Sequence, residues 1–137
     1  VPAENVQLHL PSSLSSDVRA DVAGEDLVTI ESRLRFAEMS DALDELRRQI
    51  QTRSFVHKFR ILNITGQKRS SRTQSLIDSV QIRVVATQSR YRRARAAYLT
   101  LAVPGDWEGQ FRILKDTDVV GPSGEAILDA EEADTGR

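Results

Sequence analysis

The sequence predicts an all-α protein: a long antiparallel helical hairpin with coiled-coil-like packing, a short third helix, an extended N-terminal arm and a loose acidic C-terminal tail. Two observations carry this prediction. Apolar residues recur at steps of three and four along two long stretches, which is the spacing of a helix with one buried face. A short break containing Gly66 separates the two stretches, and helices of similar length joined by a short loop fold back on each other.

The composition limits the fold and the class of protein. A chain of 137 residues is one domain, and 39% apolar with 28% charged residues indicates a narrow core of the kind found in elongated helical pairs. The chain has no cysteine, which excludes disulfides and thiolate metal sites and fits an intracellular protein. We expect no membrane span, because no apolar run is long enough. The first residue is Val1, so we expect a fragment or a processed form of a larger parent chain.

Residues 1–24 predict an extended arm with one short helical turn. Pro2 and Pro11 resist helix formation, and the apolar residues between them alternate with polar ones. An edge strand fits this pattern, but an arm that lies along the helices is favoured. Ser16 or Asp17 would cap a short helical turn that Gly24 ends.

The first long helix is expected from Glu25 to about Arg60. Its apolar residues fall into two sets that are offset from each other, so the apolar face is broad or drifts around the helix. Residues 55–64 contain β-branched and aromatic side chains, and a strand is the alternative there. The first set is Leu27, Ile30 and Leu34; the second is Phe36, Met39, Leu43, Leu46 and Ile50.

The second long helix is expected over residues 72–101, after a break at residues 63–72. Gly66 would stop the first helix and Ser70 or Ser71 would cap the second. Alternation at residues 80–84 also fits a strand, but the sustained spacing favours helix. The expected stripe is Thr73, Ile77, Val80, Val84, Thr87, Tyr91, Ala94, Tyr98 and Leu101. The expected packing or oligomer seam is Leu43, Leu46, Ile50, Ile77, Val80, Val84, Tyr91 and Tyr98.

A third helix is expected to follow Asp106, which is a good capping residue. Trp107, Phe111 and Leu114 would then share one face. The hairpin and this helix together span residues 25–118. Residues 119–137 contain a Gly-Pro turn followed by acidic residues, and they predict a linker and a loose tail.

The net charge of −1 hides three charge blocks. Residues 1–45 have three basic residues against ten acids, residues 46–105 have thirteen against Asp78 alone, and residues 106–137 have three against nine acids. Blocks of this size indicate either internal pairing or a charged partner. In an antiparallel hairpin the acids of the first helix would face the last arginines of the second, so we expect part of the charge to pair across the seam.

The bend of the hairpin is predicted to be strongly positive, because few acids lie near it. Basic side chains beside a Gly-Ser loop suit sequence-independent contact with nucleic-acid phosphates, although no aromatic residue is placed there for base stacking. The alternatives are that the acidic arm or tail folds over this basic tip, or that an acidic segment of another subunit or an acidic surface of another protein meets it. The candidate residues of the basic tip are Arg53, Lys58, Arg60, Lys68, Arg69 and Arg72.

No residue set in the sequence predicts catalysis. His9 and His57 are isolated from each other, and the acids Asp41, Asp44 and Glu45 have no histidine at metal-ligand spacing. The single Gly66 is not a phosphate-binding glycine loop. We therefore expect no metal ion, no cofactor and no small-molecule substrate.

Several stretches resemble a family of predicted fungal proteins. They are residues 10–14 (LPSSL), 31–35 (ESRLR), 41–47 (DALDELR), 65–67 (TGQ), 91–95 (YRRAR) and Trp107. The chain resembles a helical region of transposase-derived proteins of the Kyakuja-Dileera-Zisupton (KDZ) type. The resemblance covers roughly residues 10–118, includes no catalytic residue, and implies a segment that lies beside a nuclease core.

The sequence thus predicts a non-enzymatic helical module of a transposon-derived protein. We expect it to self-associate and to contact DNA or RNA electrostatically, with an intracellular and, for such a partner, nuclear location. The alternative is a purely structural module whose basic tip binds an acidic protein. A single hairpin cannot bury both apolar faces, so we expect the third helix and the arm to cover the open side, or two hairpins to pair into a four-helix bundle.

Overall fold

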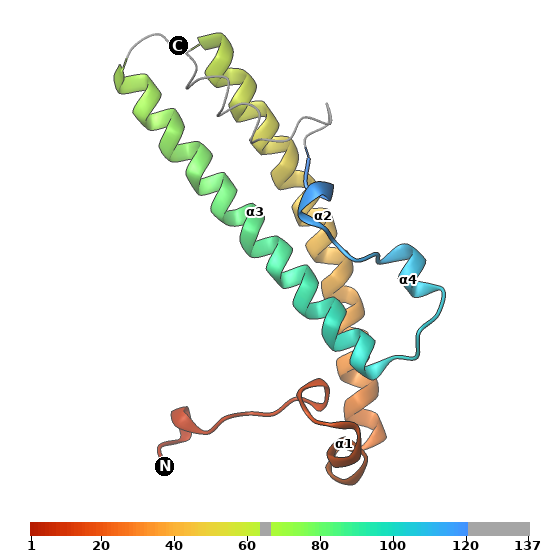
Figure 1. Cartoon of the computed structure of the whole chain (residues 1–137). Helices are drawn as coiled ribbons and strands as arrows, with labels where there is room; N and C mark the ends of the chain where they lie inside the picture. Colours follow the sequence, from red (N-terminus) through yellow and green to blue (C-terminus); the bar gives the residue numbers. More distant parts are fainter. Residues whose placement is uncertain (64–66, 121–137) are drawn as a thin grey trace.

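The protein is an all-α hairpin in the computed structural model (Figure 1). The structure describes the backbone of residues 1–63 and 67–120, and the side chains of residues 1–60 and 71–120. Within these residues it contains helices and no strand. The predicted fold class is therefore confirmed, and the predicted acidic tail lies outside the described residues.

Two long helices, α2 (Glu25–Asn63) and α3 (Gln67–Leu101), pack antiparallel and form the hairpin. The predicted start of α2 is confirmed. The alternative of a strand after residue 55 is wrong as far as Asn63, because the helix continues to that residue.

α3 begins earlier than the sequence predicted. Ser70 and Ser71 lie inside α3, so the prediction that one of them caps this helix is wrong. Gln67, Lys68 and Arg69 are good helix formers, and the helix begins with them. The predicted stop at Gly66 lies outside the described residues.

The core lies along the seam between α2 and α3. One cluster joins Met39 and Ala42 to Tyr91 and Ala94, and a second joins Leu46 to Val80 and Val84. The stripe predicted on the second helix is confirmed, because every one of its nine residues is buried or half-buried. The predicted seam residues also pack there: Leu43, Leu46, Ile50, Ile77, Val80, Val84, Tyr91 and Tyr98 are all buried or half-buried.

The N-terminal apolar set of α2 lies outside this core. Leu27, Ile30 and Leu34 are each more than half exposed, although the sequence predicted them as part of the buried face. At 3.6 residues per turn, these three side chains lie on a different side of α2 from the buried Met39 and Leu46, and that side faces away from α3. The apolar residues of α2 therefore lie on two different faces of the helix, of which one is buried against α3 and the other is exposed.

Residues 102–120 form a segment, here called the C-terminal strap, that covers one side of the hairpin. It contains one helical turn, α4 (Trp107–Gln110), and one 3-10 turn, η3 (Asp116–Asp118). The third helix is thus shorter than predicted, since Phe111 and Leu114 lie outside it. The Asp106 side chain makes no capping hydrogen bond. Gly109 has a low helix propensity. After Gln110 the chain is not helical, and side chains of α3 donate hydrogen bonds to its backbone carbonyls.

Buried side chains of the strap, and hydrogen bonds from α3 side chains to its backbone carbonyls, hold the strap in place. Phe111 is buried against the first cluster with its ring centroid 5.0 Å from that of Phe36, and Val119 is buried in the second. The Tyr91 hydroxyl donates to the Arg112 carbonyl at 2.7 Å, and burial raises the pKa of Tyr91. Arg95 donates to the carbonyl of Phe111 at 2.9 Å.

The N-terminal arm contains η1 (Ala3–Asn5), η2 (Pro11–Ser13) and α1 (Ser16–Val22). The predicted short helical turn exists, but its N-cap residue is Ser15. η2 contacts both long helices, and the chain before it extends away from the hairpin (Figure 1). The arm therefore lies against the helices only around η2, and residues 1–10 are exposed.

Arg19 fixes this arm to the end of the hairpin. Its guanidinium donates to the carbonyls of Pro11 and Leu14, each at 2.8 Å, and to the carbonyl of Thr100 at 3.2 Å. One side chain of α1 thus joins the turn η2 to the last turn of α3.

Candidate interaction surface

The predicted basic-tip residues do not all reach the surface near the bend. Lys58 on α2 and Arg72 on α3 are exposed, and Arg60 is half-buried. Lys68 and Arg69 belong to the first turn of α3, and their side chains lie outside the described residues. The two long helices thus bring Lys58 and Arg72 to the same end of the hairpin.

Arg53 is a core residue, and its assignment to the basic tip was wrong. Its side chain is 2% exposed and donates to Oε1 of Gln81 and to the carbonyl of Val119, each at 3.1 Å. Burial lowers the pKa of Arg53, because the charged form loses hydration. A signal in the sequence could have shown this, since Arg53 continues the buried spacing of Leu46 and Ile50.

A row of three arginines on α3 replaces Arg53 in the candidate surface. Arg72, Arg83 and Arg90 are spaced by 11 and 7 residues, so a helix of 3.6 residues per turn places them on one side, over about 27 Å. Arg72 and Arg83 are exposed, and neither has a carboxylate partner among the described residues. Arg92 and Arg95 lie on the other side, against the strap.

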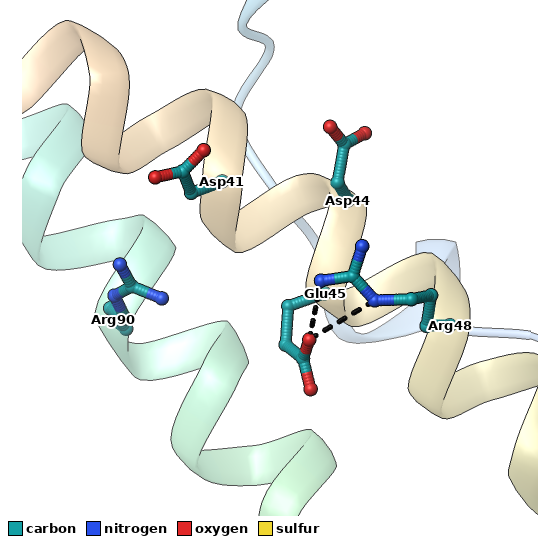
Figure 2. A pocket seen from close by; sticks show the side chains of 5 residues that line it. All are labelled: Asp41, Asp44, Glu45, Arg48 and Arg90. Atoms are coloured by element: carbon teal, nitrogen blue, oxygen red, sulfur yellow. Dashed lines mark hydrogen bonds and ion pairs between the residues drawn. The ribbon is translucent and has the colours of Figure 1, made fainter.

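The middle of the hairpin is electrically balanced. Arg90 pairs with Glu38 at 3.6 Å across the seam, and a shallow depression of about 330 Å³ lies beside it (Figure 2). α2 supplies most of its lining, and Arg90 comes from α3. Its residues are Asp41, Asp44, Glu45, Arg48 and Arg90.

Neighbouring arginines neutralise the acids of this depression. Arg48 donates to Glu45 at 2.6 Å, and hydrogen bonds from Arg48 and Gln49 lower the pKa of Glu45. The carboxylate of Glu45 in turn raises the pKa of Arg48. Asp44 pairs with Arg47 at 2.7 Å. The depression therefore combines three carboxylates with arginines that already bind two of them, and it offers little net charge to a ligand.

The predicted pairing across the seam is largely replaced by other pairs. Of the α3 arginines, Arg90 reaches α2, whereas Arg92 pairs with Asp116 at 2.8 Å and Arg95 lies 3.8 Å from Glu108. Within α2, arginines pair with acids three or four residues away, which is the closest spacing on a helix surface. The acidic residues that neutralise the end of α3 therefore come mainly from the strap.

A polar pair in the seam was not predicted at all. The Thr87 hydroxyl donates to Oε1 of Gln49 at 2.9 Å, and Thr87 is buried. This bond satisfies both groups between two apolar clusters. Periodicity alone marks Thr87 as a stripe residue but does not show which residue of α2 it meets.

The described residues contain neither a group of three His, Cys, Asp or Glu side chains able to hold a metal ion nor a helix long and apolar enough to cross a membrane. No known protein family, curated protein or solved structure matches the chain.

Proposed function

We propose that the protein is a non-enzymatic helical module that self-associates and binds the phosphate backbone of nucleic acid through the end of its hairpin near the bend. This end, called the distal end below, comprises residues 51–60 and 71–83. A transposon-derived origin and a nuclear location remain predictions from the sequence.

The charge of the distal end is the observation that supports the proposal. These residues include five basic side chains and one acid, Asp78. Asp78 accepts a hydrogen bond from Gln74 at 2.9 Å, so its described partner is not a basic residue. With Arg53 buried, the exposed cations are Lys58, Arg72 and Arg83. Cations on two rigid helices can contact phosphates without reading bases.

An acidic protein surface is the second candidate partner. It would meet the same cations. The spacing of Arg72 and Arg83 on one side of α3 favours a partner with regularly repeated charges, as a phosphate backbone has.

The test is binding to a fluorescent duplex and to single-stranded DNA over a salt series. We expect affinity in the non-specific range, a dissociation constant of about 10⁻⁴–10⁻⁶ M at physiological salt, that falls steeply as salt rises. The Lys58→Ala/Arg72→Ala/Arg83→Ala variant should reduce the slope of log affinity against log salt by about 3, because each lost phosphate contact reduces it by about one.

The matched control is Arg33→Ala/Arg93→Ala/Arg112→Ala, which removes the same charge from exposed positions outside the distal end. It should retain most of the affinity and the slope. No binding at low salt, or equal losses in the two variants, would reject the nucleic-acid proposal. Binding to polyglutamate and not to DNA would favour the acidic protein partner.

A further inference from the structure

The outer face of α2 carries apolar residues at both ends and charges in the middle. Ile30 and Leu34 are 54% and 64% exposed near its start, and Phe55 and Phe59 are 70% and 49% exposed near its end. Between them lie the exposed charges of Asp41 and Arg48. A helix of 3.6 residues per turn places all these side chains within about 60° of one another around its axis.

This face is arranged symmetrically about one point. Leu34 and Phe55, Ile30 and Phe59, and Asp41 and Arg48 each lie equally far, in sequence, on either side of the Asp44–Glu45 peptide bond. A two-fold axis through that point, perpendicular to α2, would place every one of these residues opposite its counterpart in a second copy. A surface that complements itself in this way is what a symmetric dimer requires.

We propose that the outer face of α2 is a dimer interface in which two copies of this chain pair antiparallel along α2. This inference rests on the self-association part of the proposed function and assigns it to a surface. The axis passes near Asp44 and Glu45, and the distal ends of the two copies lie at opposite ends of the dimer.

The chemistry of the facing residues suits this arrangement. At each end, Ile30 and Leu34 of one copy would pack on Phe59 and Phe55 of the other, which removes large exposed apolar side chains from water. In the middle, Asp41 of each copy would meet Arg48 of the other. One alignment of the two α2 helices therefore forms both apolar contacts and both opposite-charge pairs at the same time.

Acids meet at the two-fold axis, but they are already paired. Asp44 binds Arg47 at 2.7 Å and Glu45 binds Arg48 at 2.6 Å within each copy. Arg47 offsets the charge of Asp44, and Arg48 would lie between Glu45 of its own copy and Asp41 of the other and contact both. Repulsion at the axis is accordingly weak.

The surface is tested by sedimentation equilibrium of the full chain with two matched variants. Ile30→Glu places a charge in the proposed apolar contact, whereas Ile82→Glu places one on α3, where Ile82 is 70% exposed. Both positions are on the surface, so helix content measured by circular dichroism should not change. We expect the dissociation constant of the dimer to rise at least about tenfold with Ile30→Glu and to be unchanged with Ile82→Glu.

The register is tested by disulfide cross-linking, since the chain contains no cysteine. In the antiparallel dimer the two copies of Ile30 lie about 44 Å apart, too far for a disulfide. Ile30→Cys alone should therefore not cross-link, and the Ile30→Cys/Phe59→Cys variant should form covalent dimers. Rapid cross-linking of the single variant would show parallel pairing and overturn the proposal.

The remaining outcomes separate this inference from the proposed function. A dimer that is insensitive to Ile30→Glu overturns the assigned surface and leaves self-association standing. A monomer at every soluble concentration overturns both. Binding of nucleic acid is measured separately, with the distal-end variant on a duplex too short to reach both distal ends, so its result does not depend on either outcome.

Discussion

Glu31 is a buried carboxylate that joins the N-terminal arm to α2. It accepts hydrogen bonds from the Ser12 amide at 2.9 Å and the Ser12 hydroxyl at 2.6 Å, and it pairs with Arg35 at 3.2 Å. Burial opposes the ionisation of Glu31, but the bonds from Ser12 and Arg35 outweigh it and lower the pKa of Glu31. The charged form is therefore the one that holds the arm.

This pKa shift predicts a pH-dependent contribution to stability. Because the pKa is lower in the folded than in the unfolded state, the contribution is full above the ordinary glutamate pKa of about 4.3 and is lost as the pH falls through the folded value. At neutral pH, Ser12→Ala should lower the free energy of unfolding by about 1–2 kcal/mol. The control Ser13→Ala removes a hydroxyl that bonds only to the Leu10 carbonyl among the described residues. In urea unfolding, the Ser12→Ala deficit should shrink at pH 3, whereas a deficit independent of pH would contradict the role of Glu31.

Arg53 makes a second contact between distant segments, because it joins α2 to the last residues of the strap. Arg53→Ala should lower the free energy of unfolding by on the order of 2 kcal/mol, because it removes buried contacts and leaves the Val119 carbonyl without its donor. Hydrogen exchange at residues 117–120 should become faster in this variant. Arg47→Ala is the control, since its exposed pair with Asp44 should be worth less than about 1 kcal/mol. Equal effects of the two variants would contradict the structural role of Arg53.

The C-terminal strap is a third layer that covers the apolar clusters between α2 and α3 on one side of the hairpin. Phe111 is 2% exposed within the first cluster, whereas Ile113, two residues later, is 67% exposed. Phe111→Ala should lower the free energy of unfolding by about 3–5 kcal/mol, and Ile113→Ala should change it by less than about 0.5 kcal/mol. Thermal unfolding followed by circular dichroism measures both. A small effect of Phe111→Ala would show that the strap is not part of the cooperative fold.

The sequence predicted α3 and its buried side well because one repeated spacing determines both. From Thr73 to Leu101 the steps of three and four never break, and each of these residues lies in or beside the core. The buried face of α2 was harder to predict, because apolar residues occur on two of its faces and their spacing does not show which face meets α3. The strap was harder still, since its position depends on Phe111 and Val119 fitting between side chains that are distant in sequence.

The candidate surface could be predicted from the sequence only in part. A charge block near the bend is visible in composition, but burial is not, and Arg53 was therefore counted with the exposed cations. The pairing of the arginines also depends on which side of α3 each faces. Arg90 and Arg92 differ by two positions, and the first pairs with α2 and the second with the strap.

For the whole molecule, the two proposed surfaces meet at the distal end of the hairpin but use different side chains. The dimer face runs along the outside of α2 and includes Phe55 and Phe59, whereas the nucleic-acid surface uses Lys58, Arg72 and Arg83. An antiparallel dimer would hold its two distal ends apart, at opposite ends of the assembly, so that each could bind a different stretch of one long nucleic acid.

Bivalent binding predicts a dependence on the length of the nucleic acid. Ile30→Glu should weaken apparent binding to a long duplex by at least about tenfold, because the second contact is no longer intramolecular. It should leave binding to a duplex too short for both ends unchanged. Fluorescence anisotropy with the two duplexes measures the difference, and an equal loss for both would contradict bivalent binding.

The distal end of the hairpin is the surface that we propose meets nucleic acid. The most direct measurement is an NMR titration of the labelled full chain with a short duplex at low salt. We predict that amide shifts change at residues 55–60 and 71–83, and that residues 90–118 are unaffected. Shift changes confined to residues 90–118, or none at all, would contradict it.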